Sequence, residues 1–153
     1  MGRVVFMCGP AGSGKSTLAR RLESEGMTRL SFDVEAWRRG HRSMPIPEAD
    51  RREIEVALRD RLVDLVATGA DVVLDFSFWS RRMREEYRAL LRPLGVEPET
   101  IYLATPREVV LARVRARTGA DVDDFPLSED LAAAYADQFE PPTPDEGPLT
   151  VLE

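Results

Sequence analysis

The sequence predicts an α/β fold of three layers, in which helices cover both faces of a parallel sheet of about five strands. Short apolar runs alternate with segments of helical period along the chain, and this alternation favours parallel strands joined by right-handed helical crossovers. The runs are uniformly apolar, as in strands that are buried on both faces. The length of 153 residues suits one domain over residues 1–153. A helical lid is expected at about residues 113–130.

Five short runs rich in apolar or β-branched residues are expected to form strands. They lie at residues 3–8, 27–32, 71–76, 99–104 and 149–152. The first run, "RVVFMC", ends at a Gly-Pro pair, which is typical of a buried strand that stops at a turn.

Helices are expected where apolar residues recur three or four positions apart. Such segments lie at residues 15–24, from 48 to the stop at Gly69, at 81–94, from Pro106 to about 117, and from Ser128 onward. Pro106 is suited to the first turn of its helix, and Gly69 to a helix end. A short helix at residues 35–39 is an alternative to a loop there.

Composition limits the function classes. Lys and Arg number 21 against 27 Asp and Glu, so the surface as a whole lacks the positive field that non-specific nucleic-acid binding needs. The single cysteine, Cys8, is expected in the core, which fits a reducing, cytoplasmic setting. No apolar stretch approaches the ~18 residues of a membrane span. His41 is the only histidine, so the sequence offers no histidine cluster for zinc or for a Ser-His-Asp triad.

The stretch "GPAGSGKS" at residues 9–16 matches G-x-x-x-x-G-K-[ST] between an expected strand and an expected helix. In such a loop the backbone N–H groups and the helix N-terminus form a site for phosphate groups. Lys15 can reach the β- and γ-phosphates, and the Ser16 hydroxyl can bind Mg²⁺. The alternative is a glycine-rich turn with a surface lysine. The residues expected to bind a nucleoside triphosphate are Gly9, Ala11, Gly12, Ser13, Gly14, Lys15, Ser16 and Thr17.

Two aspartates, Asp33 and Asp75, follow or end expected strands. Ligands of open parallel sheets bind at the carboxyl ends of the strands, so both carboxylates are expected to face the phosphate loop. Asp33 can accept the proton of an attacking hydroxyl group. Asp75 can either hold Mg²⁺ or orient the acceptor. For each aspartate the alternative is a helix N-cap.

Arginines are dense from Arg107 to Arg117. Arg113 and Arg117 lie four residues apart, on one helix face, before a glycine-containing loop. Such guanidinium groups suit a lid that closes on a transferred phosphoryl group. Arg107 and Arg115 are expected on a solvated helix face.

The segment "FSFWSRRMR" after Asp75 combines aromatic and basic residues, as an acceptor pocket can. Ser77 can donate a hydrogen bond to an acceptor, and Arg81 can pair with an anionic one. Arg38 is a further candidate for acceptor binding.

These motifs, in this order, resemble those of the small P-loop kinases grouped with AAA-type ATP-binding proteins. The group includes the kinase domain of phage-type polynucleotide 5′-kinase, chloramphenicol phosphotransferase and the zeta toxins, and the resemblance covers residues 4–131. It implies a P-loop NTPase fold, with Asp33 as general base, Asp75 and Ser77 as the Asp-x-[Asn/Ser] motif, and Arg113 and Arg117 as lid arginines. Polynucleotide kinases carry an acceptor-binding arginine three residues after the base, a position that Ala36 occupies here.

The expected activity is transfer of the γ-phosphoryl group of ATP, with Mg²⁺, to a hydroxyl group of a small molecule such as an antibiotic, a sugar or a nucleoside. The expected catalytic residues are Lys15, Asp33 and Arg117. A 5′-hydroxyl polynucleotide kinase is the second reading, and a nucleotide-dependent switch or ATPase without a dedicated acceptor is the third.

Overall fold

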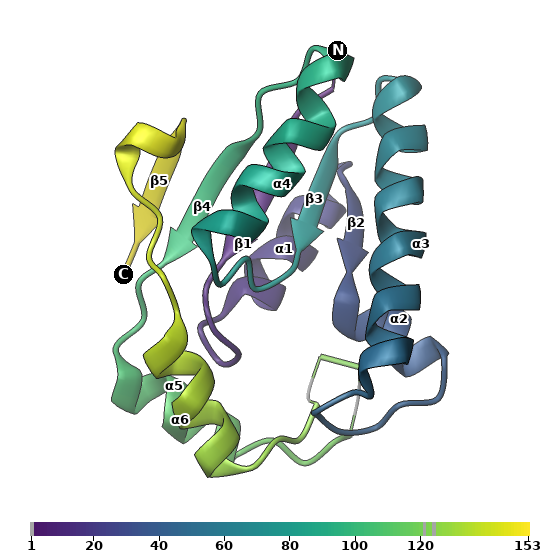
Figure 1. Ribbon diagram of the computed structural model, residues 1–153. Coiled ribbons are helices and arrows are strands. Elements are labelled where there is room, and N and C mark those ends of the chain that lie inside the picture. The colour runs from purple at the N-terminus through teal and green to yellow at the C-terminus, as the bar shows by residue number, and fades with distance from the viewer. Residues whose placement is uncertain (1, 121, 124) are drawn as a thin grey trace.

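The computed structural model (Figure 1) describes residues 2–120, 122–123 and 125–153. Within these residues, parallel strands form one sheet in the spatial order β2-β3-β1-β4-β5. The strands are β1 (Val4–Cys8), β2 (Thr28–Ser31), β3 (Val72–Asp75), β4 (Glu99–Leu103) and β5 (Leu149–Leu152). The predicted parallel sheet is confirmed, and each predicted strand bound lies within one residue of the observed one.

Helices connect the strands and lie on both sides of the sheet (Figure 1). They are α1 (Lys15–Ser24), α2 (Phe32–Arg38), α3 (Glu48–Ala67), α4 (Arg81–Leu91), α5 (Arg107–Arg115) and α6 (Glu129–Gln138), with 3₁₀ turns η1 (Arg92–Leu94) and η2 (Pro144–Glu146).

Several helix ends differ from the predicted ones, and α4 stops at Leu91, three residues earlier than predicted, where the 3₁₀ turn η1 begins. Helix α2 begins directly after β2, because the Ser31 side chain accepts a hydrogen bond from the Val34 N–H and caps the helix. Ser31 is therefore the N-cap, and Asp33 lies inside the first turn. Helix α5 stops at Arg115, two residues earlier than predicted, and the chain reaches Gly119 with a φ of +75°.

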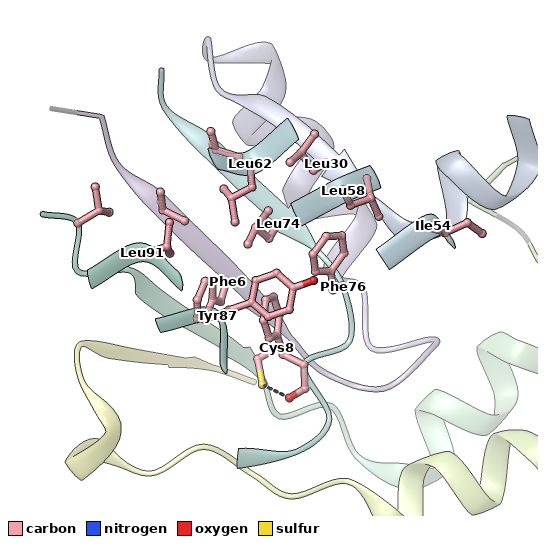
Figure 2. Packing of buried hydrophobic residues seen from close by; sticks show 14 of the residues in the cluster. Phe6, Cys8, Leu30, Ile54, Leu58, Leu62, Leu74, Phe76, Tyr87 and Leu91 are labelled. Carbon is pink, nitrogen blue, oxygen red and sulfur yellow. Dashed lines mark hydrogen bonds between the residues drawn. The ribbon is translucent and has the colours of Figure 1, made fainter. Parts of the chain in front are cut away.

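Alternate residues of β1 pack into different cores. Phe6 and Cys8 belong to the core beneath α3 and α4 (Figure 2), whereas Val5 and Met7 pack with Ala19 of α1 on the other face. This period of two explains the unbroken apolar run, because both faces of β1 are covered. Cys8 is fully buried in the core, as predicted, and this burial raises the pKa of its thiol to about 12.

The carboxyl ends of β1 and β3 point toward the end of the molecule where α5 and α6 lie (Figure 1). The chain between those helices crosses this end and contacts the loop before α3, where the Met44 N–H donates to the Pro126 carbonyl at 3.1 Å. This segment corresponds to the predicted lid at residues 113–130, of which Asp121 and Asp124 lie outside the described residues. In the described part of the chain, no helix is both long enough and apolar enough to cross a membrane.

Candidate active site

The phosphate loop, residues 9–16, joins β1 to α1 as predicted. The Gly9 N–H donates to the Ser77 carbonyl at 3.1 Å, and the Ser13 N–H donates to the Pro10 carbonyl at 3.0 Å. At Gly12 the φ is +87°, and a Cβ there would lie 2.8 Å from the Val110 carbonyl oxygen. Only glycine fits that turn. The loop is thus held in a fixed shape directly before the N-terminus of α1, where unpaired N–H groups favour an anion.

A pocket of about 580 Å³ opens beside this loop. Lys15, Asp33, Asp75 and Arg117 all line it, so four predicted residues from different parts of the chain meet at one place. Lys15 is the only lysine in the sequence. No described residue forms a hydrogen bond or an ion pair with it.

Asp33 lies in the first turn of α2, at the pocket wall. Burial raises the pKa of its carboxyl group, which the nearby positive charges of Lys15 and Arg117 counteract only in part. No hydrogen bond from a described residue reaches this carboxyl. A carboxyl group with a raised pKa, whose oxygens accept no hydrogen bond from the described residues, is suited to accept a proton.

Asp75 ends β3 and is 4% exposed. Its Oδ2 accepts two hydrogen bonds from Arg29, whereas Oδ1 is buried without a partner among the described residues. Arg29 also donates to Asp123 of the lid at 2.7 Å. We did not predict Arg29 as a site residue. The signal in the sequence was a single charged residue, Arg29, within the expected strand at residues 27–32.

The two lid arginines occupy different places. Arg113 Nη1 donates to the Gly12 carbonyl at 3.2 Å, so this exposed side chain lies on the outside of the phosphate loop. Arg117 lies beyond the end of α5, lines the pocket and donates to the Phe125 carbonyl at 3.0 Å. They do not share a helix face as predicted, because the helix ends between them.

Other predicted residues are divided between the pocket and the surface. Ser77 lines the pocket. Arg38 is paired with Glu35, and Arg81 with Asp145 at 2.9 Å, and neither arginine lines the pocket. Thr17 is exposed on α1. The remaining phosphate-loop residues, Ala11, Ser13, Gly14 and Ser16, follow one another along the loop, and Ser13 Oγ is buried without a hydrogen-bond partner among the described residues.

Helices α3 and α4 supply pocket residues that we did not predict. Glu55 and Leu58 come from α3, and Tyr87 comes from α4. In the sequence they fit the ordinary pattern of an amphipathic helix, so spacing alone did not distinguish a pocket wall from a core or a solvated face.

Comparison with known proteins identifies a family. The family described as AAA domain matches residues 4–142. No curated protein sequence matches the chain significantly.

Solved structures share the fold. A chain of the Pnkp1/Rnl/Hen1 RNA repair complex matches with a TM-score of 0.74 and 18% identity, over 90% of this chain and 43% of that one. Kti12 from Chaetomium thermophilum, in complex with ADP-AlF3, matches with a TM-score of 0.71 and 18% identity, over 97% and 88% of the two chains. A gluconokinase from Sinorhizobium meliloti matches with a TM-score of 0.65 and 23% identity, over 98% of this chain and 81% of that one.

These structural matches and the family match agree with the observed sheet and helices, so the predicted three-layer P-loop NTPase fold is confirmed. The chain spans less than half the length of the RNA repair chain that it matches, 43% and 38% in two structures of that complex.

Proposed function

Because the chain belongs to the AAA domain family, we propose that it is a P-loop kinase, which transfers the γ-phosphoryl group of ATP to a hydroxyl group of a small molecule. Asp33 carries this proposal. A half-buried carboxyl group with a raised pKa, and without a hydrogen-bond partner among the described residues, shares one pocket with Lys15 and Arg117. An acceptor hydroxyl needs such a proton acceptor beside the phosphate loop.

In the proposed reaction the phosphate loop and Lys15 bind the triphosphate, and Asp33 takes the proton of the acceptor hydroxyl. The acceptor oxygen forms a bond to the γ-phosphorus while the bond from that phosphorus to the β–γ bridging oxygen breaks, so ADP leaves with the bonding electrons. Arg117 stabilises negative charge on the transferred group. The structure of Kti12 with ADP-AlF3 supports the choice of an adenine nucleotide as donor.

The residues beside the loop fit a magnesium ion. The Asp75 Oδ1 is a buried carboxylate oxygen without a partner among the described residues, and the Ser16 hydroxyl lies in the first turn of α1. Oxygen ligands of this kind are those that Mg²⁺ prefers. When bound, Mg²⁺ neutralises part of the charge on the phosphate oxygens. Asp75 keeps its second proposed role, orienting the acceptor, because it also lines the pocket.

A small molecule is the first choice of acceptor. The pocket volume of about 580 Å³ falls within the range of sites for drug-sized ligands. The gluconokinase likeness supports a small hydroxyl compound in general. A nucleic-acid 5′-hydroxyl is the second choice, because the RNA repair complex supplies another structural neighbour, while the acidic surface and Ala36 weigh against it.

The direct test is Asp33→Ala, assayed for ADP formation and phosphorylated product against panels of antibiotics, nucleosides, sugars and 5′-hydroxyl oligonucleotides. We expect a fall in transfer of about 10²–10⁴-fold, with the thermal stabilisation by Mg-ATP retained. Asp60→Ala, at an exposed position of α3, is the matched control. Full transfer by Asp33→Ala would refute the general base. If the wild type forms ADP but phosphorylates no acceptor, the hypothesis of a nucleotide-dependent switch or ATPase would be favoured.

Nucleotide binding has its own test in Lys15→Ala. Mg-ATP is expected to raise the Tm of the wild type, because a ligand that binds only the folded state stabilises it, and to leave that of Lys15→Ala nearly unchanged. An equal rise in both proteins would contradict the role of the phosphate loop.

A further inference from the structure

Residues of α3, α4 and α6 line the same pocket as Asp33, and we name one group of lining residues the acceptor end. The group consists of Glu48, Glu55, Leu58, Trp79, Tyr87 and Tyr135. Its residues come from α3, α4, α6 and the turn after β3. Lys15, Asp33 and Arg117 line the same pocket, so a molecule bound by the acceptor end can present a hydroxyl group toward Asp33.

Glu55 is the distinctive polar group of this region. The side chain is half-buried on the pocket side of α3, and no described residue donates a hydrogen bond to its carboxylate or lies in an ion pair with it. A half-buried carboxylate that has no ion pair among the described residues can take a positive charge or hydrogen-bond donors from a ligand.

The positive groups near Glu55 are already engaged. Arg51 is half exposed and lies 3.9 Å from Glu48, which also pairs with Arg52 at 2.8 Å. Arg59 lies over the ring of Tyr87, with 4.9 Å between its Cζ and the ring centroid, and its Nη2 pairs with Glu86 at 3.4 Å. Arg59 does not line the pocket. Glu48 is therefore already paired with two arginines, whereas the Glu55 carboxylate has no ion pair among the described residues, and this negative charge disfavours an anionic ligand beside it.

Aromatic rings form the rest of the acceptor end. Trp79 is 47% exposed and Tyr135 is 38% exposed, although both line the pocket. Exposed large rings gathered around a concavity are typical of a ligand site. Aromatic faces bind apolar groups and also attract cations through their quadrupole. Tyr87, which Figure 2 shows beside Phe76, adds a buried ring to the same wall.

From the unpaired carboxylate, the charge balance and the aromatic wall, we propose that the acceptor is a hydroxyl compound with an apolar body and a protonated amine, which Glu55 binds. This inference rests on the proposed kinase function and specifies its substrate class. It excludes acceptors that carry a carboxylate or a phosphate group at the acceptor end.

Three matched probes test the charge preference: 2-amino-1-phenylethanol, which is cationic, 1-phenyl-1,2-ethanediol, which is neutral, and mandelate, which is anionic. Kd values are measured by ligand-observed NMR with Mg²⁺ and a non-hydrolysable ATP analogue present. We expect the amine to bind at least ~10-fold more tightly than the diol, and mandelate more weakly than both, because a charge-assisted hydrogen bond and a cation–π contact favour the amine.

Glu55→Gln should reduce the preference for the amine over the diol to within about 3-fold, since the amide removes the charge but keeps the shape. Glu53→Gln is the control, because Glu53 lies on the same helix, outside the pocket and exposed, and it should keep the full preference. Mandelate binding as tightly as the amine, or an unchanged preference in Glu55→Gln, would overturn the inference.

Product analysis with ATP separates this inference from the proposed function. If the wild type phosphorylates a sugar or mandelate in preference to the amine, the kinase proposal stands and the substrate class is wrong. If the amine binds through Glu55 but no acceptor in any panel is phosphorylated, the pocket chemistry stands and the kinase proposal fails.

Discussion

Arg29 of β2 donates two hydrogen bonds to the same carboxylate oxygen of Asp75, at the end of the neighbouring strand β3. The side chains are 7% and 1% exposed. The same guanidinium group donates to Asp123, between α5 and α6, so a single buried arginine joins the end of the sheet to that segment. This contact leaves Asp75 Oδ1 buried without a hydrogen-bond partner among the described residues.

Arg29→Met should lower the free energy of unfolding by about 3–5 kcal/mol, because it leaves the Asp75 carboxylate without its buried positive partner. Urea denaturation at pH 7 measures the change. Arg20→Met is the matched control, since Arg20 pairs with Asp123 from a half-exposed position and its loss should cost at most about 1 kcal/mol. Equal losses in the two variants would show that burial does not strengthen the Arg29 contacts.

Asp33 should make the protein less stable as pH rises. Its pKa is raised in the folded state by burial, so the folded protein binds the proton more tightly than the unfolded chain does. Its contribution to stability is therefore present below the unfolded pKa of about 4 and is lost as pH rises through the folded pKa. Asp33→Asn removes this dependence and should be more stable than the wild type at pH 8.

Urea denaturation from pH 4 to pH 8 measures the difference between the two proteins, which should shrink toward acid pH. Each unit by which folding raises the pKa of Asp33 corresponds to about 1.4 kcal/mol in the free energy of unfolding. A variant less stable than the wild type at pH 8 would mean that Asp33 serves the fold. A more stable variant that has lost transfer would mark a residue whose burial serves catalysis at a cost in stability.

Local signals account for what the sequence predicted well. The phosphate loop and the strand bounds follow from residues that are near neighbours in the chain, such as the apolar run before Gly9. Parallel pairing then brings strand ends together, which is why Asp33 and Asp75 could be placed at one edge before the fold was known.

Long-range ion pairs account for the site residues that the sequence did not predict. Arg29 and Asp75 are 46 residues apart, and no periodicity links them. Arg81 was expected in the acceptor pocket, but its partner is Asp145, 64 residues later. Glu55 has no motif around it, and only the shape of the pocket distinguishes it from the other charged residues of α3.

Arg117 and Arg113 should affect catalysis differently. Arg117 lines the pocket with Asp33, so Arg117→Ala should lower kcat far more than it changes the KM for ATP, as expected for a contact made in the transition state. Arg113 lies outside the phosphate loop, against the Gly12 carbonyl, and Arg113→Ala should mainly raise the KM for ATP. Steady-state kinetics with an acceptor that the wild type phosphorylates separates the effects of the two substitutions. Equal effects of Arg117→Ala on kcat and KM would assign that side chain to ground-state binding.

Glu146 should stabilise the fold and, through Arg84, hold the turn after β3 that lines the pocket. Burial alone would raise the pKa of its carboxyl group, but hydrogen bonds from Arg84 and the Thr143 N–H outweigh this effect and hold the pKa at about 2. Arg84, which is 0% exposed, also donates to the Phe78 and Glu140 carbonyls at 2.7 and 2.9 Å. The pair therefore fixes the turn that places Ser77 at the pocket.

Glu146→Gln should lower the free energy of unfolding by about 3–5 kcal/mol at pH 7, because Arg84 is left buried and charged without its partner. Since the folded pKa lies near 2 and the unfolded one near 4.5, the stabilisation is present above pH 4.5 and is lost as pH falls toward 2. The difference between wild type and variant in urea denaturation should shrink over that interval. Asp145→Asn, next in the chain but exposed, should show little change. If Glu146→Gln remained as stable as the wild type yet phosphorylated acceptors more slowly, the pair would position the turn after β3 without stabilising the fold.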